Sequence, residues 1–388
     1  MVEVNTNIPY GNACDVSVTQ SRGGWEVAFA PDPHGGPETL WFCLRVQRTG
    51  SDPGGDTQLR LVLKHTDNIL GGHTPSVIHP VVRQEGGDWT RLEEGEVREA
   101  PDGRRSVAWT VEMSRAYLEV ATSYPYGRPE LDALVRESDG YWQRDTIGVS
   151  QGGRPLIRLS NEYGVPESQR PGLYLVARQH AAEVSGSWVL DGFLREIQAM
   201  DVSASAPAVP LIWAVPLTNI DGIEQGDYGK DNFPYDLNRA WGRPPMRHET
   251  LVFQNDMQGW VTRCRPTLGI DFHAPGACET TGIYTYVPDP EMDRAAYNAV
   301  LPWVTEAEAA LGGEYAAESF ARVARYPSRW ETPSFRKYGW PNLGVPCTTF
   351  ENPYAMVNGR ILTRKDYREA GARIARAVVK VLASKLGV

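Results

Sequence analysis

The sequence contains no apolar run that approaches membrane-spanning length, which excludes a transmembrane helix. Its start, Met1 to Tyr10, lacks both a basic and an apolar segment, so we expect no secretory signal peptide. The five cysteines are widely scattered and form no CxxC pair, a usage typical of reduced thiols in a cytoplasm. We therefore predict a soluble, cytoplasmic protein that does not associate with membranes.

The sequence also lacks an excess of positive charge. Its 48 acidic and 39 basic residues give a formal net charge of −9, which argues against nucleic-acid binding as the main function. Internal repeats and low-complexity tails are absent as well. With 388 residues, 41% of them hydrophobic and 22% charged, the chain has an ordinary globular composition and a length that suits two domains.

Residues 1–125 consist of short apolar or alternating runs separated by clusters of glycine, proline, aspartate and asparagine. This spacing predicts an antiparallel β-sandwich. The four histidines in this region have no metal-like partner pattern, and we interpret the region as a scaffold rather than a reaction centre. The expected strands are 25–29, 40–46, 59–63, 77–82, 106–112 and 117–121.

Residues 126–388 follow a stretch rich in proline and glycine, and their pattern alternates between strands and helices. Such alternation predicts a mixed sheet covered by helices on both faces, an α/β/α domain, with ligand groups beyond the carboxyl ends of the strands. The expected strands are 146–150, 156–159, 173–177, 209–215, 267–272, 282–287 and 345–350. The expected helices are 130–138, 184–200, 246–263, 290–311 and 364–386, with a long loop at 218–245.

His180 and Glu183 lie where the buried strand 173–177 gives way to a helix. Side chains three positions apart in a first helical turn point to the same side, so they could bind one metal ion. His273 ends another strand, and two histidines with one glutamate are a known ligand set for catalytic zinc. Taken alone, the His-x-x-Glu pair could equally be a helix cap.

Three further pieces of sequence fit a metal site of this kind. Asp236 could accept the free ring N–H of a histidine ligand, and otherwise it is part of a turn. Asn238 and Arg239 could hold a carboxylate, and otherwise Arg239 makes a surface ion pair. Glu351 follows an apolar strand and could act as general base on a zinc-bound water, and otherwise it is a solvated strand end.

In this order, the motifs resemble those of the zinc metallocarboxypeptidases related to carboxypeptidase A. The matching segments are His180-Ala181-Ala182-Glu183, Asn219-Ile220-Asp221-Gly222, Asp236-Leu237-Asn238-Arg239, Asp271-Phe272-His273 and Thr349-Phe350-Glu351. Residues 147–155 are similar to that family's first hairpin, and residues 40–46 and 121–126 are similar to the sandwich of its cytosolic carboxypeptidase branch. The resemblance implies a carboxypeptidase-like catalytic domain. It also implies zinc on His180, Glu183 and His273, with Glu351 as base.

The resemblance has one serious departure. Gly229 stands where many relatives have the arginine that polarises the scissile carbonyl, and Lys230 is the nearest replacement. Arg336 lies in the region that resembles the pocket for the terminal side chain. It would favour an acidic residue there, unless it belongs to a solvated basic loop. Tyr326 and Tyr338 are both candidates for a phenol that covers the substrate.

These observations predict a zinc-dependent metallocarboxypeptidase that removes a C-terminal residue, in one reading an acidic one, from a peptide or protein tail. A second hypothesis keeps the zinc but makes the protein an amidase or deacylase for a small acyl-amino acid, a cell-wall peptide or a similar peptide-like metabolite. A third makes it a catalytically weak module that binds acidic tails.

Overall fold

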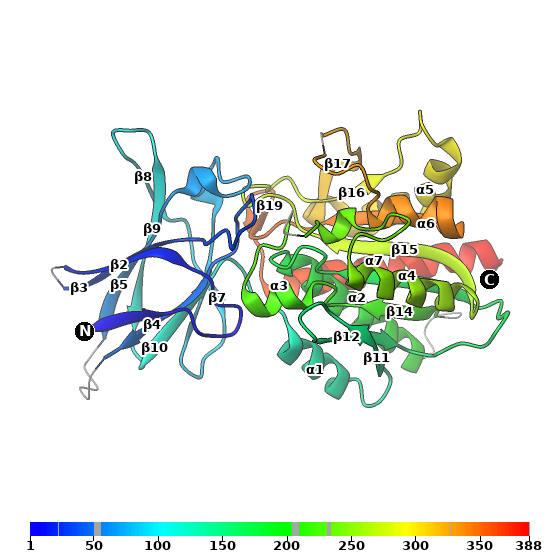
Figure 1. Cartoon of the computed structure of the whole chain (residues 1–388), viewed down its shortest axis with the longest axis horizontal. Coiled ribbons are helices and arrows are strands. Elements are labelled where there is room, and N and C mark those ends of the chain that lie inside the picture. The colour runs from blue at the N-terminus through cyan, green and yellow to red at the C-terminus, as the bar shows by residue number, and fades with distance from the viewer. Residues whose placement is uncertain (22, 50–55, 204–208, 231–233, 327, 388) are drawn as a thin grey trace.

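Two five-stranded sheets make up the N-terminal part of the computed structural model, which describes residues 1–21, 23–49, 56–203, 209–230, 234–326 and 328–387 (Figure 1). Along β5, alternate residues Leu59, Leu61 and Leu63 point into the core between the sheets, as the period of a strand requires. One sheet has the order β1 (Val2–Asn5), β4 (Cys43–Arg48), β10 (Tyr117–Ala121), β6 (Val81–Gln84), β7 (Thr90–Arg91). The other has the order β2 (Cys14–Ser21), β3 (Gly24–Ala30), β5 (Thr57–Leu63), β9 (Arg105–Met113), β8 (Glu96–Glu99).

An eight-stranded mixed sheet forms the centre of the C-terminal part. Its middle strands run parallel, and every residue of β13 and β14 is buried because helices cover both faces. The strand order is β11 (Gln143–Val149), β12 (Pro155–Ser160), β14 (Leu211–Val215), β13 (Pro171–Ala177), β15 (Arg265–His273), β18 (Cys347–Glu351), β16 (Ile283–Val287), β17 (Ala316–Val323).

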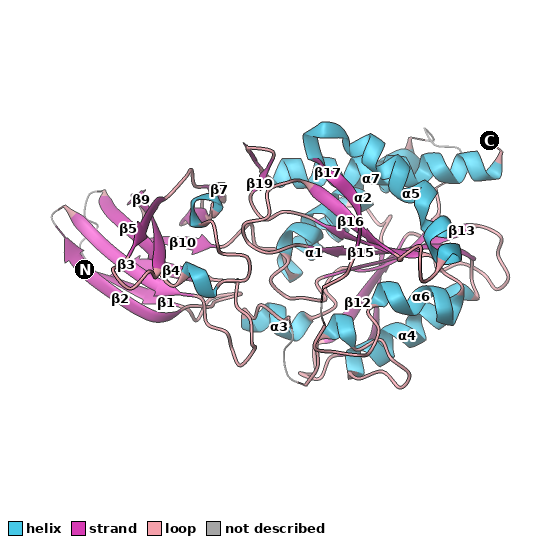
Figure 2. Ribbon diagram, turned by 90° about the horizontal axis from the view of Figure 1, so that it is seen from above, coloured by secondary structure: helices cyan, strands magenta, loops and turns pink. Residues whose placement is uncertain are grey.

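Helices lie on both faces of this sheet. In Figure 2, α2 (Val184–Val202), α5 (Arg294–Tyr315) and α7 (Arg364–Leu386) cover one face. On the other face lie α4 (His248–Val261) and α6 (Phe335–Leu343). None of the helices in the described ranges is both long and apolar enough to cross a membrane. The remaining elements are α1 (Arg128–Glu137), α3 (Ile220–Gln225), η1 (Thr66–Asn68), η2 (Pro75–Val77), η3 (Leu237–Arg239), β19 (Met356–Val357) and β20 (Arg360–Ile361).

The predicted fold class is confirmed, with differences in detail. The sandwich is antiparallel except that β3 and β5 pair in parallel. β17 and α6 were not predicted from the sequence, and the long loop predicted at 218–245 contains α3 and η3. β10 ends at Ala121 and α1 begins at Arg128, and we propose a domain boundary at 125/126 between them.

The parallel strands β13, β15 and β18 are neighbours, and their carboxyl ends meet at one edge of the sheet. His180 follows β13, His273 ends β15, and Glu351 ends β18. The register pairs His273 directly with Glu351. Residues far apart in the sequence are therefore neighbours at this edge because of the sheet topology.

Candidate active site

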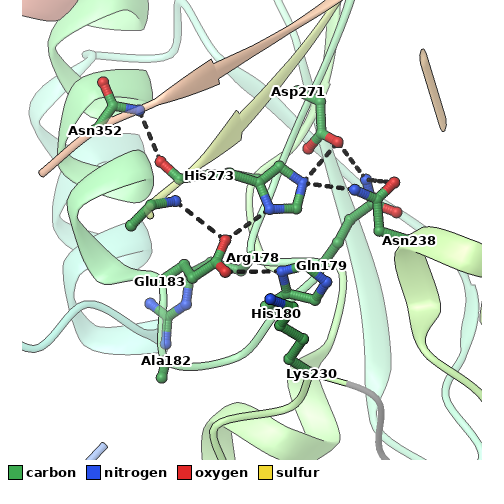
Figure 3. Close-up of polar contacts among 12 residues, drawn as sticks. Arg178, Gln179, His180, Ala182, Glu183, Lys230, Asn238, Asp271, His273 and Asn352 are labelled. Atoms are coloured by element: carbon green, nitrogen blue, oxygen red, sulfur yellow. Dashed lines mark hydrogen bonds and ion pairs between the residues drawn. The ribbon is translucent and has the colours of Figure 1, made fainter. Parts of the chain in front are cut away.

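The turn between β13 and α2 carries His180 and Glu183. Glu183 occupies the N-cap position of α2, but its side chain makes no capping hydrogen bond. It turns instead toward the two histidines, as Figure 3 shows. The alternative reading of the pair as a helix cap therefore does not describe the structure.

His180, Glu183 and His273 form a buried cluster. Nδ1 of His180 lies 2.7 Å from Oε1 of Glu183, and Nδ1 of His273 lies 2.6 Å from Oε2. One potential ligand atom from each residue lies within 4.8 Å of the others, so the cluster can hold a metal ion. Two imidazole nitrogens and a carboxylate oxygen are a donor set that suits zinc.

The outer ring nitrogens of both histidines face aspartates. Nε2 of His180 lies 3.2 Å from Oδ1 of Asp236, and Nε2 of His273 lies 2.7 Å from Oδ2 of Asp271. An aspartate accepts the Nε2 proton and thereby leaves the Nδ1 lone pair for a metal. The orientation of both rings therefore suits metal binding at Nδ1.

The charges around the cluster also favour a cation. Burial opposes protonation of His180, but Glu183 and Asp236 outweigh it and raise the pKa of this imidazole to about 9. Burial likewise opposes protonation of His273, whose pKa is nevertheless raised well above its ordinary value by Asp271 and Glu183. Extra protons on the rings are one way to offset the buried carboxylates. A divalent metal ion is the other.

The backbone of the turn is strained and firmly held. Arg178 has a φ of 67°, in the left-handed region, and its buried guanidinium donates to the backbone oxygens of Ala181 at 2.7 Å and Tyr126 at 2.5 Å. On the other side of the cluster, Asn352 donates to the backbone oxygen of His273 at 2.9 Å. Strained residues held by buried hydrogen bonds occur preferentially at functional sites.

Glu351 lies beside His273 on the neighbouring strand. Its Oε2 atom is buried and has no hydrogen-bond partner in the described part of the chain. Burial raises the pKa of this carboxyl to about 7, with His273 acting in the opposite direction. A carboxyl group with a pKa near neutrality beside a metal cluster can accept and return a proton.

A cavity of about 350 Å³ opens over the cluster. His180, Glu183, His273 and Glu351 line one part of it, and Arg239 contributes a cation elsewhere on its wall. Arg239 donates to the Asn238 backbone oxygen at 3.0 Å and to the Tyr326 hydroxyl at 3.4 Å. The other lining residues include Leu70, Gly71, Tyr228, Lys230, Asn238, Tyr284, Tyr286, Tyr326, Trp330, Arg336 and Lys337.

Arg336 also lines the cavity, at the first turn of α6. Within the described ranges it has neither a hydrogen bond nor an ion pair, and burial lowers the pKa of its guanidinium. A half-buried cation in this environment can pair with an anion that enters the cavity. Asn238 is already engaged, because its side-chain oxygen accepts from Gln179 and from the backbone N–H of Phe335, each at 3.1 Å, and its side-chain nitrogen lies 3.0 Å from Nε2 of His273.

The predicted site residues all line the cavity except Asp236. Asp236 does not line the cavity, but it contacts His180 from behind. The two tyrosines separate, because Tyr326 lines the cavity and is 53% exposed, whereas Tyr338 is fully buried away from it.

Some residues of the site escaped the sequence analysis. Asp271 could have been assigned a role, since it lies two positions before His273 on one strand and therefore on the same face. Nothing in the sequence pattern points to Tyr284, Tyr286 or Trp330, or to Leu70 from the sandwich.

A cluster of metal-binding residues with an adjacent buried carboxyl group is typical of metal-dependent hydrolases. No protein-family model matches the chain. Cytosolic carboxypeptidase 1 of Gallus gallus is 26% identical over 160 residues, which are 37% of this chain and 13% of that protein. Cytosolic carboxypeptidase 6 of Mus musculus is 28% identical over 180 residues, 42% of this chain and 33% of that protein. The chain thus spans about a third or less of the length of these curated relatives.

Solved structures match almost the whole chain. The metallo-carboxypeptidase of Burkholderia cenocepacia has a TM-score of 0.76 at 18% identity and covers 99% of both chains. The metallo-carboxypeptidase of Pseudomonas aeruginosa, solved with (2-guanidinoethylmercapto)succinic acid, has a TM-score of 0.73 at 17% identity and covers 98% of this chain and 99% of its own. The chain has their fold. The predicted relationship to the metallocarboxypeptidases is confirmed, and the relatives agree with the predicted enzyme class, a hydrolase.

Proposed function

We propose that this protein is a cytoplasmic zinc metallocarboxypeptidase that removes a C-terminal residue, preferably an acidic one, from a peptide or protein tail. The observation that carries the proposal is the composition of one cavity. Metal-binding residues and Glu351 line one part of it, and the cations Arg239 and Arg336 line another. A peptide end has the complementary features, a scissile carbonyl and a terminal carboxylate.

His180, Glu183 and His273 are the proposed zinc ligands. Zinc held there would polarise the scissile carbonyl and lower the pKa of a nearby water. Asp236 and Asp271 keep the two imidazoles in the required orientation. In this proposal Glu351 takes a proton from the attacking water and later gives it to the departing amine, a task suited to a carboxyl with a pKa of about 7.

Arg239 is the proposed partner of the substrate's terminal carboxylate. Its guanidinium lies in the cavity, and a charge-assisted contact with a carboxylate would be stronger than its hydrogen bonds to the Asn238 backbone oxygen and the Tyr326 hydroxyl. Tyr326, whose hydroxyl touches Arg239, is the proposed phenol that covers the bound end. Asn238 supports this position through its backbone oxygen.

Arg336 is the proposed reason for acidic specificity. It provides a second cation in the cavity, and Lys337 lies beside it on the same turn. The N-terminal turn of α6 adds a partial positive charge, since backbone N–H groups are exposed there. One carboxylate on the main chain and one on the side chain would therefore both find a cation. Lys230 is the proposed charge at the oxyanion, in place of the arginine that Gly229 excludes.

A comparison of peptides with free and amidated C-termini tests the proposal. Arg239→Ala should lower kcat/KM on free peptides by about tenfold or more, because the charge-assisted contact with the terminal carboxylate is lost. Amidated peptides should be poor substrates already and lose little. Arg243→Ala, an exposed arginine four residues on, is the matched control and should change neither.

Each other outcome has a definite meaning. If wild-type protein cuts amidated and free peptides equally well, the carboxypeptidase proposal is wrong and the amidase hypothesis replaces it. If zinc-loaded protein binds acidic peptides without any turnover, it is a binding module.

A further inference from the structure

The loop Gly226–Lys230 follows α3, and Figures 1 and 2 both place α3 on the side of the C-terminal part that faces the sandwich. Buried Asn12 of the sandwich donates to the backbone oxygen of Gly226 at 2.8 Å. Gly226 has a φ of 73°, and a Cβ there would lie 2.4 Å from the backbone oxygen of Gly11. Only glycine permits this close contact, so the sandwich holds the start of the loop tightly.

The sandwich contacts the loop at two further side chains. Nδ1 of His34 lies 2.7 Å from Oδ1 of Asp227. Oε2 of Glu38 lies 3.4 Å from the ammonium of Lys230, the residue that the loop places in the cavity. The other oxygen of Glu38 contacts the guanidinium of Arg329, next to the cavity-lining residues Ser328 and Trp330. One carboxylate of the sandwich thus joins two segments beside the cavity.

The same edge of the sandwich also forms part of the cavity wall. The backbone oxygen of Thr39, the residue after Glu38, accepts a hydrogen bond from the backbone N–H of Leu70 at 2.9 Å. Leu70 and Gly71 line the cavity, and the Leu70 backbone oxygen accepts from Ala277 at 2.9 Å. Glu38 therefore belongs to a packed interface between the sandwich and the C-terminal part, and it is not an isolated surface charge.

Lys230 requires such a partner. Its side chain is 26% exposed, and the carboxylates that face it are Glu38, Glu183, Glu351 and Asp236. A lysine has a flexible stem and no planar fork, so its position is set by the anion that it contacts. Without Glu38, the remaining attraction is toward Glu351 and the metal-binding carboxylate, where the ammonium would oppose the base.

We propose that Glu38 is a positioning residue that holds the Lys230 ammonium where the carbonyl oxygen develops charge, so that the sandwich completes the active site. The inference rests on the proposed function, in which Lys230 stabilises that oxygen. It assigns to the sandwich a part in catalysis in addition to its role as a scaffold. Burial lowers the pKa of Lys230, but Glu38 and the other carboxylates outweigh it and keep the ammonium charged.

The test is a double-mutant cycle of Glu38→Gln and Lys230→Met in the zinc-loaded 388-residue chain. Glu38→Gln should lower kcat by about tenfold with little change in KM, since the lost contact acts in the transition state. In the Lys230→Met background the same change should have almost no effect. Equal effects in both backgrounds would overturn the proposal. Zinc content and Tm should equal those of the wild type, and if Glu38→Gln does not fold, Glu38→Asp takes its place with a smaller loss.

Two matched controls separate positioning from general damage. Arg329→Gln removes the other partner of Glu38 and should leave kcat unchanged; a tenfold loss would mean that Glu38 acts through Arg329 instead. Glu96→Gln breaks an ion pair of the sandwich with Arg60, at 2.8 Å and on the surface, and should also leave kcat unchanged.

A measurement that needs no turnover keeps this inference distinct from the proposed function. The chain has six lysines, so the Lys230 signal can be assigned by NMR of ¹³C-labelled lysine with Lys230→Met as reference. The pKa of Lys230 should fall in Glu38→Gln whether or not any peptide is cut. An unchanged pKa would overturn the contact, whereas a lowered pKa in a protein without peptidase activity would refute only the proposed function.

Discussion

Glu351→Gln is the substitution that most directly tests the proposed chemistry. It removes one carboxylate and keeps the size of the side chain. Because Oε2 of Glu351 has no hydrogen-bond partner in the described part of the protein, the fold does not depend on its charge. The variant should retain zinc and fold while kcat drops by about 10²-fold or more, the usual scale for a general base.

The raised pKa of Glu351 also gives a magnitude for stability. Burial shifts this pKa from an ordinary 4.5 to about 7, so the folded protein binds the proton more tightly than the unfolded chain does. The stabilising contribution of this group is therefore fully present below pH 4.5 and is lost as the pH rises through about 7. At about 1.4 kcal/mol per pKa unit, metal-free wild type loses about 3 kcal/mol in this range. Glutamine has no proton to lose and escapes this penalty.

Chemical denaturation of the metal-stripped proteins at pH 5 and pH 8 measures the difference. Glu351→Gln should be the more stable protein at pH 8, with a smaller advantage at pH 5. In zinc-loaded wild type, kcat/KM should rise with pH to a plateau, with the midpoint at or below 7 because a cation favours the carboxylate. A variant with nearly wild-type kcat would refute Glu351 as base.

Two further predictions concern the metal and the specificity. Purified wild type should contain about one zinc per chain, and metal analysis of His180→Ala and His273→Ala should show its loss; undiminished zinc in either variant would refute that ligand. Arg336→Met should reduce the preference for a terminal glutamate over glutamine by about tenfold in kcat/KM, since a charge-assisted contact is lost. Lys337→Met, on the same turn but exposed, should reduce it much less, and equal effects would contradict the role of Arg336.

The elements with strong periodicity were predictable from sequence. The apolar run Leu173–Ala177 and the helix after Glu183 follow the observed β13 and α2 closely. The predicted end of a helix at residue 311 is physically meaningful, since Gly312 has a φ of 60° and breaks the regular part of α5. By contrast, α6 contains Gly339 and Pro341, which are poor helix formers, and its packing rather than its pattern makes it a helix.

The cluster of candidate metal ligands was predictable because neighbouring parallel strands end at a common edge of the sheet. His180 and His273 could be recognised from their positions at or just after strand ends, taken together with the order of the other motifs. The contacts of Glu38 with Lys230 and of Asn12 with Gly226 could not, since they join residues about two hundred positions apart without any periodic signal. The sequence therefore predicts the chemistry of the site better than the surfaces that surround it.

The last prediction concerns Gly229, which stands where the resemblance to the metallocarboxypeptidases leads us to expect an arginine. Gly229 has a φ of 77°, and a Cβ there would lie 2.6 Å from the backbone nitrogen of Ala181 and 2.9 Å from Nδ2 of Asn219. The contact at Ala181 is with the turn that holds the two metal-binding residues. A side chain at 229 would therefore displace that turn or the loop.

Gly229→Ala should lower the free energy of unfolding by about 1–3 kcal/mol more than Gly153→Ala does. Gly153 is the matched control, because its φ of 76° is nearly the same and nothing lies within 4 Å of its Cβ position. Both variants pay the cost of the left-handed backbone, so the difference isolates the contact with the turn. Zinc affinity should fall in Gly229→Ala alone, and Gly229→Arg should lose activity rather than gain it. Equal losses of stability at the two glycines would show that the turn does not exclude a side chain at position 229. An active Gly229→Arg protein would also refute this reasoning, because an arginine could then stand at position 229 and Lys230 would not be needed in its place.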